Sequence, residues 1–287
     1  MSEPNTSFME GPGFGCFFII GAMKAGTGSL YNYLAGHPDI HASPVKEPKF
    51  FANPAPTVSE VCAYRALFEG RTNERWVFEA SSAYSKYPHR DGVPARIRRM
   101  APGARFIYLL RHPVHRIFSA YAHNLAHGRE RRPAGTAVFE DGYLDVSRYY
   151  LQLQQYLTFF PKDRILVLLF EDLVAERETT VRRVFRFLDL DDAVPLGNLG
   201  RRFNETSRKR APGPLLRVLK ATPGYTRWPW RVRNYCYNRL SVPLPPRQAL
   251  VDPQVYNALL EELQDDVTNL KSLLGDELQA WDLSYHA

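Results

Sequence analysis

The stretch Phe17-Phe-Ile-Ile-Gly-Ala-Met-Lys24-Ala-Gly26-Thr27-Gly28-Ser29-Leu30 joins a short apolar run to a glycine-bearing turn and a helical pattern. The run Phe17 to Ile20 predicts a buried strand, and the pattern from Thr27 to Ala35 predicts a helix. A turn of this kind directs backbone N–H groups and a helix N-terminus toward one point, where Lys24 adds a full positive charge. The stretch therefore predicts a phosphate-binding loop, with an ordinary strand-to-helix connection as the alternative.

The spacing of this loop differs from that of the nucleotide triphosphatases, whose pattern is GxxxxGK[ST]. Gly21 and Gly26 have the required separation, but Thr27 stands where that pattern has lysine, and Lys24 lies at the front of the loop. The loop therefore predicts an anion site of a related but distinct kind.

Further strands and helices alternate along the chain. Strands are predicted at 76–79, 106–110 and 165–170, and helices at 94–100, 113–127, 144–160, 176–188 and 253–274. This alternation predicts a three-layer α/β fold, with a mostly parallel central sheet flanked by helices. Ligands of such sheets bind beyond the carboxyl ends of the strands.

Composition narrows the class of protein. The 287 residues are 45% hydrophobic and 23% charged, which excludes a disordered chain or a coiled coil and predicts one domain over residues 15–287 after a flexible segment at 1–14. The three cysteines, at 16, 62 and 236, form no zinc pattern, and the apolar run 16–23 is too short for a signal core or a membrane span. We therefore expect a cytoplasmic protein.

The net charge of the chain favours an anionic ligand or surface without identifying it. Lys and Arg number 37 against 30 Asp and Glu, an excess of +7.

Two motifs resemble those of the PAPS-dependent sulfotransferases, in the bacterial form related to the heparan sulfotransferases, whose fold is P-loop-like. Lys24-Ala-Gly-Thr-Gly-Ser-Leu30 is similar to the family's 5′-phosphosulfate loop, KxGTxxL. Arg111-His-Pro-Val-His-Arg-Ile-Phe-Ser119-Ala-Tyr121 is similar to its 3′-phosphate motif, RxPxxRxxSxY. The later strand with its FEDL ending at 170–173, and the last helix followed by Trp281, also resemble this family.

The resemblance implies PAPS as the sulfuryl donor and PAP as the product, with no metal required. It assigns the 5′-phosphosulfate to six consecutive residues: Lys24, Ala25, Gly26, Thr27, Gly28 and Ser29. It assigns the 3′-phosphate to Arg111, whose planar fork can donate two hydrogen bonds, and to Ser119. Arg208 and Lys209 fall where the family closes a loop over the nucleotide, although a solvated charge run is an equal alternative.

The acceptor must lose a proton, so a base is needed. Lys46-Glu-Pro-Lys-Phe-Phe51 resembles the family element KExxFF, which makes Glu47 the expected base, with His41 and His37 as competitors. Ala80 occupies the position where heparan-type enzymes often carry a catalytic lysine. The second cation is therefore either Lys46 or absent.

Two other functions stay open at this point. A P-loop kinase of small molecules fits the strand, loop and helix, but it conflicts with the position of Lys24. A nucleic-acid or membrane-surface binding protein fits the basic aromatic segment at 201–238. For a sulfotransferase we expect a small-molecule, glycan or lipid acceptor and no nucleic acid, while peripheral membrane contact and oligomeric state are open.

Overall fold

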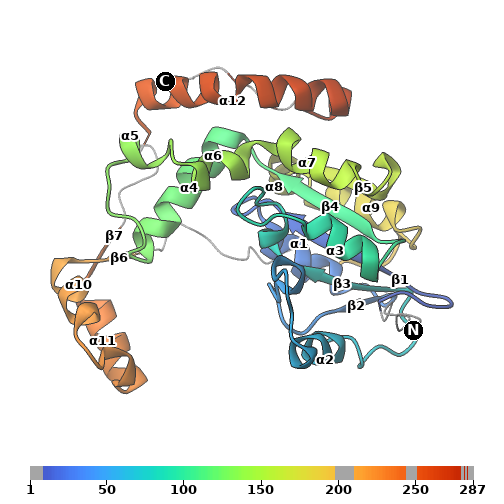
Figure 1. Ribbon diagram of the computed structural model, residues 1–287, viewed down its shortest axis with the longest axis horizontal. Coiled ribbons are helices and arrows are strands. Elements are labelled where there is room, and N and C mark those ends of the chain that lie inside the picture. Colours follow the sequence, from blue (N-terminus) through green and yellow to red (C-terminus); the bar gives the residue numbers. More distant parts are fainter. Residues whose placement is uncertain (1–8, 198–209, 244–250, 279–280, 282, 284–287) are drawn as a thin grey trace.

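The computed structural model describes residues 9–197, 210–243, 251–278, 281 and 283 (Figure 1). Of the segment 1–14 that we expect to be flexible, residues 1–8 lie outside this range, and the boundaries of the domain stay a prediction. Arg208 and Lys209 also lie outside the described residues. Among the described helices, none is long and apolar enough to cross a bilayer.

The centre of the molecule is a five-stranded parallel sheet. Its strands are β1 (Gly15–Gly21), β2 (Ile40–Ala42), β3 (Trp76–Ala80), β4 (Arg105–Leu110) and β5 (Ile165–Leu169), in the spatial order β2-β3-β1-β4-β5. The strands β2 and β3, which follow β1 in the chain, lie on one side of β1, and β4 and β5 lie on its other side. The carboxyl ends of β1 and β4 therefore form a topological switch point, where ligands of α/β sheets bind.

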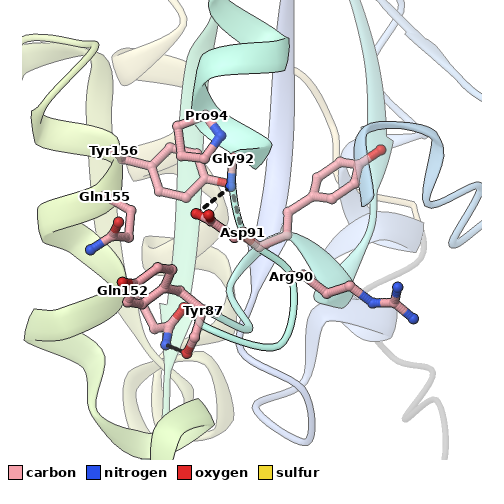
Figure 2. A pocket seen from close by; sticks show the side chains of 9 residues that line it. Tyr87, Arg90, Asp91, Gly92, Pro94, Gln152, Gln155 and Tyr156 are labelled. Carbon is pink, nitrogen blue, oxygen red and sulfur yellow. Dashed lines mark hydrogen bonds between the residues drawn. The ribbon is translucent and has the colours of Figure 1, made fainter. Parts of the chain in front are cut away.

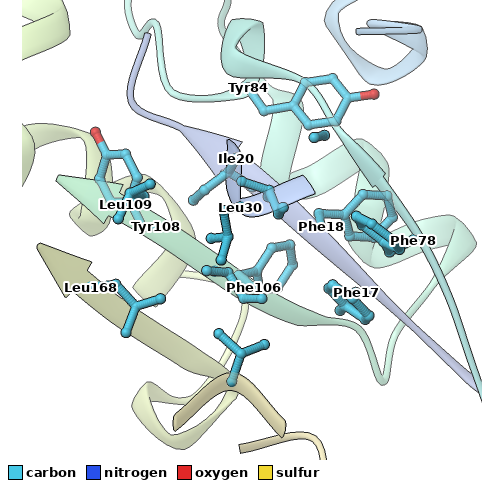
Figure 3. Close-up of a cluster of buried hydrophobic side chains, with 14 of the residues drawn as sticks. Phe17, Phe18, Ile20, Leu30, Phe78, Tyr84, Phe106, Tyr108, Leu109 and Leu168 are labelled. Atoms are coloured by element: carbon cyan, nitrogen blue, oxygen red, sulfur yellow. The ribbon is translucent and has the colours of Figure 1, made fainter. Parts of the chain in front are cut away.

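Alternate residues of β1 pack against two different helical layers (Figure 3). Phe17 stacks on Phe78, with ring centroids 4.6 Å apart, and Tyr31 of helix α1 lies against the same Phe78. Phe18 faces the other way, toward Phe51, Tyr84 and Phe106. Tyr156 and Phe160 extend that second layer over Phe106. Both faces of the sheet are thus covered, which confirms the predicted α/β class.

The helices and short 3₁₀ turns have the following bounds. The α-helices are α1 (Thr27–Leu34), α2 (Val58–Ala66), α3 (Val93–Met100), α4 (Pro113–Ala126), α5 (Ala134–Ala137), α6 (Asp141–Leu144), α7 (Tyr149–Leu157), α8 (Phe170–Ala175), α9 (Arg177–Phe187), α10 (Pro214–Ala221), α11 (Trp230–Leu240) and α12 (Pro253–Leu274). The 3₁₀ turns include η1 (Phe50–Ala52), η2 (Ser82–Tyr84), η3 (Asp145–Ser147), η4 (Lys162–Arg164), η6 (Tyr225–Arg227) and η8 (Gly275–Leu278). A second, antiparallel pair joins β6 (Arg210–Pro212) to β7 (Ser241–Pro243).

The single helix predicted at 144–160 is wrong. The structure ends α6 at Leu144 and begins α7 at Tyr149, with Arg148 at φ −78° and ψ 76° between them. The cause is Arg116 of α4, a fully buried side chain that donates to the Tyr143 carbonyl and to Ser147 Oγ. A continuous helix would pair that carbonyl with the backbone instead, so the burial of Arg116 interrupts the helix.

Candidate active site

The loop between β1 and α1 lies at the carboxyl edge of the sheet. Lys24 has φ 76° and Gly26 has φ 93°, so the chain turns twice through the left-handed region before the helix begins. A Cβ at Gly26 would lie 2.9 Å from the ring of Phe170, which explains the need for glycine at this close approach. Gly26 has no side chain to cap α1, so the first turn of the helix presents backbone N–H groups to an anion.

Arg111 joins the second predicted motif to this loop. It follows β4 directly, and its Nη1 donates to the Lys24 carbonyl oxygen at 3.3 Å. The guanidinium carbon of Arg111 lies 4.7 Å from the ring centroid of Phe170. The Tyr149 hydroxyl donates to the backbone carbonyl of Arg111 at 2.7 Å. Two cations far apart in sequence, Lys24 and Arg111, therefore lie at one site.

The remaining members of the predicted nucleotide site differ in exposure. Ala25, Thr27 and Gly28 are buried at the start of α1, while Gly26 and Ser29 are half-buried. Ser119 lies in α4 with only 1% of its surface exposed. Its assignment to the 3′-phosphate stays a prediction.

Glu47 is held against the end of β3 by a pair of serines. Its carboxylate oxygens accept from the Ser82 backbone N–H at 3.2 and 3.1 Å and from Ser82 Oγ at 3.2 Å. The Ser81 hydroxyl accepts from the Lys49 N–H at 3.0 Å, and Glu47 and Lys49 both have positive φ, 60° and 58°. The Glu47 carboxylate is thus fixed in position at the same edge of the sheet as the Lys24 loop.

The competing histidines lie elsewhere. His41 is in β2 opposite Val77, three residues before the end of β3, and its Nδ1 lies 3.6 Å from Glu74 Oε1. His37 is buried, with its ring nitrogens bonded to the Asp191 carbonyl and the Asp39 N–H. Neither ring is placed to take a proton at the edge where Lys24 and Glu47 lie.

Beneath Glu47 lies a second, fully buried carboxyl group, Glu79. It accepts hydrogen bonds from the hydroxyls of Tyr64 (3.1 Å), Tyr84 and Ser81 (2.7 Å). Burial raises the pKa of Glu79 to about 7, although the three hydroxyl donors act in the opposite direction. Ser81 bonds both Glu79 and the Lys49 backbone, so the buried carboxyl group supports the loop that carries Glu47.

Lys86 is a residue of this site to which the sequence analysis gave no role. Its Nζ donates to Met23 Sδ at 3.5 Å, next to Lys24 in the chain, and among the described residues it forms no ion pair. Burial lowers the pKa of Lys86, and the neighbouring cations of Arg116, Lys49 and Arg90 lower it further, whereas Glu47 raises it. Lys86 is thus a partly desolvated cation between the Lys24 loop and Glu47.

The segment that carries Lys86 is fastened to α7 (Figure 2). The Gln152 side chain accepts from the Tyr87 N–H at 2.8 Å and donates to the Tyr87 carbonyl at 2.7 Å. The adjoining cavity, lined by Tyr84, Arg90 and Tyr156 among others, has a volume of about 10 Å³. That volume holds one water molecule and no substrate, so this cavity is not the acceptor site.

Lys46 and Lys49 complete the positive surroundings and are both exposed. The chain has only eight lysines, and four of them, Lys24, Lys46, Lys49 and Lys86, lie in this region. That clustering, in a chain whose other cations are mostly arginine, is the sequence signal that could have identified Lys86.

Comparison with known proteins finds similar sulfotransferases. A model of the sulfotransferase family matches residues 58–193. A solved sulfotransferase from Alicyclobacillus acidocaldarius superposes with a TM-score of 0.66 and 27% identity, over 98% of this chain and 99% of that one.

Curated relatives are similar over shorter stretches. Human heparan sulfate glucosamine 3-O-sulfotransferase 6 is 29% identical over 203 residues, 67% of this chain and 58% of the relative. Human bifunctional heparan sulfate N-deacetylase/N-sulfotransferase 2 is 24% identical over 196 residues, 61% of this chain and 22% of the relative. The chain therefore spans little more than half the length of the first relative and under a quarter of the second.

Proposed function

We propose that the chain is a sulfotransferase that transfers a sulfuryl group from PAPS to a hydroxyl or amine of an acceptor, because a sulfotransferase family model matches residues 58–193 and a solved sulfotransferase superposes over 98% of the chain. The observation that carries this proposal is the hydrogen bond from Arg111 to the Lys24 carbonyl, which joins two separate anion-binding elements into one site. A nucleotide with phosphates at both its 5′ and 3′ positions matches such a pair of cations. ADP or ATP would leave one of the two cations unused.

In the proposed complex the Lys24 side chain and the N–H groups of Gly26, Thr27 and Gly28 hold the 5′-phosphosulfate, because the N–H groups of Ala25 and Ser29 already donate to the carbonyls of Ala22 and Gly26. Arg111 holds the 3′-phosphate with the two parallel donors of its guanidinium. Phe170 lies against Arg111 and restricts the orientation of its plane. The nucleotide would thereby be fixed at both ends with its sulfur atom directed toward Glu47.

The transfer step is a substitution at sulfur. The acceptor oxygen or nitrogen forms a bond to sulfur while the bond from sulfur to the 5′-phosphate oxygen breaks, and the departing phosphate takes the electron pair. Glu47 accepts the acceptor's proton, and Lys24 stabilises the charge that develops on the leaving phosphate. Positioning and electrostatics supply most of the catalysis in transfers of this kind.

Lys86 fits the role of the second cation, which the sequence left to Lys46 or to no residue. Its half-buried ammonium lies beside Met23 and near Glu47, whereas Lys46 is exposed. A cation between donor loop and base stabilises negative charge on the sulfonate oxygens during transfer. Partial desolvation strengthens this interaction, because the ammonium is shielded less by water.

Kinase activity is the second candidate, because a strand, glycine-bearing loop and helix are present. Such chemistry uses Mg²⁺ held by an exposed carboxylate near the loop. The carboxyl group of β3, Glu79, is fully buried and surrounded by three hydroxyls. This geometry disfavours the kinase reading.

Turnover tests the proposal. With radiolabelled PAPS and a panel of sugar, phenol and lipid acceptors, the wild-type protein should release PAP and label one acceptor class. Glu47→Gln should lower kcat by ~10²- to 10⁴-fold, because the base is lost, while PAP affinity changes little. Glu69→Gln, an exposed residue of the same type, is the control. Transfer of the ATP γ-phosphate that requires Mg²⁺, with no use of PAPS, would instead establish the kinase.

A further inference from the structure

The positive charge of this protein is concentrated in one segment of the sequence. The 46 residues from Thr206 to Val251 contain ten Lys and Arg and no Asp or Glu. The other 241 residues therefore hold 27 basic and 30 acidic side chains, so the entire excess of +7 comes from this segment. Lys24, Arg111 and Lys86 of the candidate active site all lie outside this segment.

Within the segment, α10 and α11 form an arm, defined as residues 210–243, that extends from the body of the molecule (Figure 1). The arm begins and ends in the β6–β7 pair, and β6 contacts α4. Five basic residues lie on it and form no ion pair with another described residue: Lys220, Arg227, Arg231, Arg233 and Arg239. Their charges are not neutralised within the described part of the chain.

The arm also exposes apolar side chains. On α10, Leu215 and Val218 are 59% and 63% exposed and lie three residues apart, on one face of the helix, while Leu216 is fully buried on the opposite side. On α11, Trp230, Val232 and Tyr235 are exposed as well, with Arg231 and Arg239 among them. Six of the ten large hydrophobic side chains found exposed in the described residues lie on this arm.

We propose that the arm docks the protein on an anionic lipid surface, with the apolar face of α10 and the aromatic side chains of α11 at the interface. Basic residues attract the arm to anionic headgroups, and exposed Leu, Val, Trp and Tyr gain by burial at the boundary with the acyl chains. Pairing with the arm of a second copy is disfavoured, because it would bring two segments without acidic residues together. A soluble polyanion would use the arginines but would leave Leu215 and Val218 in water.

Vesicle co-sedimentation tests this docking, and it needs neither nucleotide nor acceptor, so its outcome is independent of the proposed reaction. The wild-type full chain should bind vesicles of phosphatidylcholine with phosphatidylglycerol at least ~tenfold more tightly than pure phosphatidylcholine vesicles, and more weakly as salt is raised. Leu215→Glu with Val218→Glu should abolish binding, and Arg231→Glu with Arg239→Glu should do the same. Val58→Glu, at an exposed apolar residue of α2, is the matched control and should bind like wild type.

Four results would overturn the proposal. Equal binding to both vesicle types would remove the role of the arginines, and unchanged binding of the Leu215/Val218 double variant would remove the role of α10. Sedimentation of the free protein as a dimer that the same double variant dissociates, without vesicle binding, would assign the face to a second copy. Binding to heparin that survives the double variant, again without vesicle binding, would assign the arm to a soluble polyanion.

Discussion

At the scale of single residues, the site depends on how a few cations are held. Lys24 is placed by its own positive φ, and Arg111 is oriented by the Lys24 carbonyl and the ring of Phe170. The Lys86 ammonium donates to the Met23 thioether and forms no ion pair with another described residue. A partly buried cation without an ion-pair partner lowers the stability of the folded protein, unless a bound anion compensates its charge.

The substitution Lys86→Met should therefore lower catalytic activity without lowering the stability of the folded protein. We expect kcat for sulfuryl transfer to fall by ~10²- to 10³-fold, as on loss of a charge-stabilising donor, with a change below about threefold in the Kd for PAP, which lacks the sulfonate. Lys86→Arg should restore part of the rate. The free energy of unfolding should not decrease, because a partly desolvated charge is removed.

Steady-state kinetics and calorimetry give these quantities, with exposed Lys271→Met on α12 as the control. If PAP affinity and kcat fell by the same factor, Lys86 would contribute to nucleotide binding and not specifically to the transition state. Unchanged turnover would remove it from the site altogether.

At the scale of elements, the segment after β3 organises the site. Ser81 and Ser82 hold the loop of Glu47, Glu79 anchors Ser81 from below, and Gln152 of α7 fastens the chain beyond Lys86. The sequence predicted β3 and the importance of this segment, but not these contacts. Hydrogen bonds between Glu79 and Tyr64, or between Gln152 and Tyr87, join residues 15 and 65 positions apart, and no local pattern reveals them.

The buried Glu79 predicts a pH dependence of stability. Its pKa is raised from 4.5 in the unfolded chain to about 7 in the folded one, so the folded state holds the proton more tightly. The resulting stabilisation is fully present below pH 4.5 and is lost as the pH rises through about 7. It amounts to about 3 kcal/mol for a shift of this size.

Urea unfolding of wild type and Glu79→Gln at a series of pH values measures this contribution. The stability of wild type relative to the variant should fall between pH 4.5 and 8 by roughly the 3 kcal/mol above, because glutamine does not titrate. Glu261→Gln, on the exposed face of α12, should keep a constant offset from wild type. A constant offset for Glu79→Gln as well would contradict the raised pKa.

At the scale of the whole molecule, four of the five strands of the sheet and several of the longer helices could be predicted, whereas the shorter elements between them could not. Short apolar runs indicated β1, β3, β4 and β5, because strands buried on both faces are apolar throughout. The three-residue strand β2 and the helix α2 gave no such signal, since α2 is mostly exposed. The split between α6 and α7 depends on Arg116, a buried charge that no periodicity reveals.

The candidate site followed the same division. The two nucleotide motifs were visible in sequence because each is a local strand-to-helix connection. Their meeting at Lys24 and Arg111 depends on β1 and β4 being neighbours in the sheet, which the order of strands decides. The basic composition of the arm was likewise visible in the sequence. Its extension from the body of the molecule could be seen only in the structure.

The central claim is that the Lys24 loop and Arg111 bind one nucleotide through two separate phosphates. Calorimetry with PAP and ADP, on wild type and Arg111→Ala, tests it most directly. The account predicts that wild type prefers PAP, and that Arg111→Ala loses about 2 kcal/mol, roughly thirtyfold, toward PAP while its affinity for ADP is nearly unchanged. Equal affinity of the wild type for the two nucleotides, or an equal loss toward both in the variant, would contradict it.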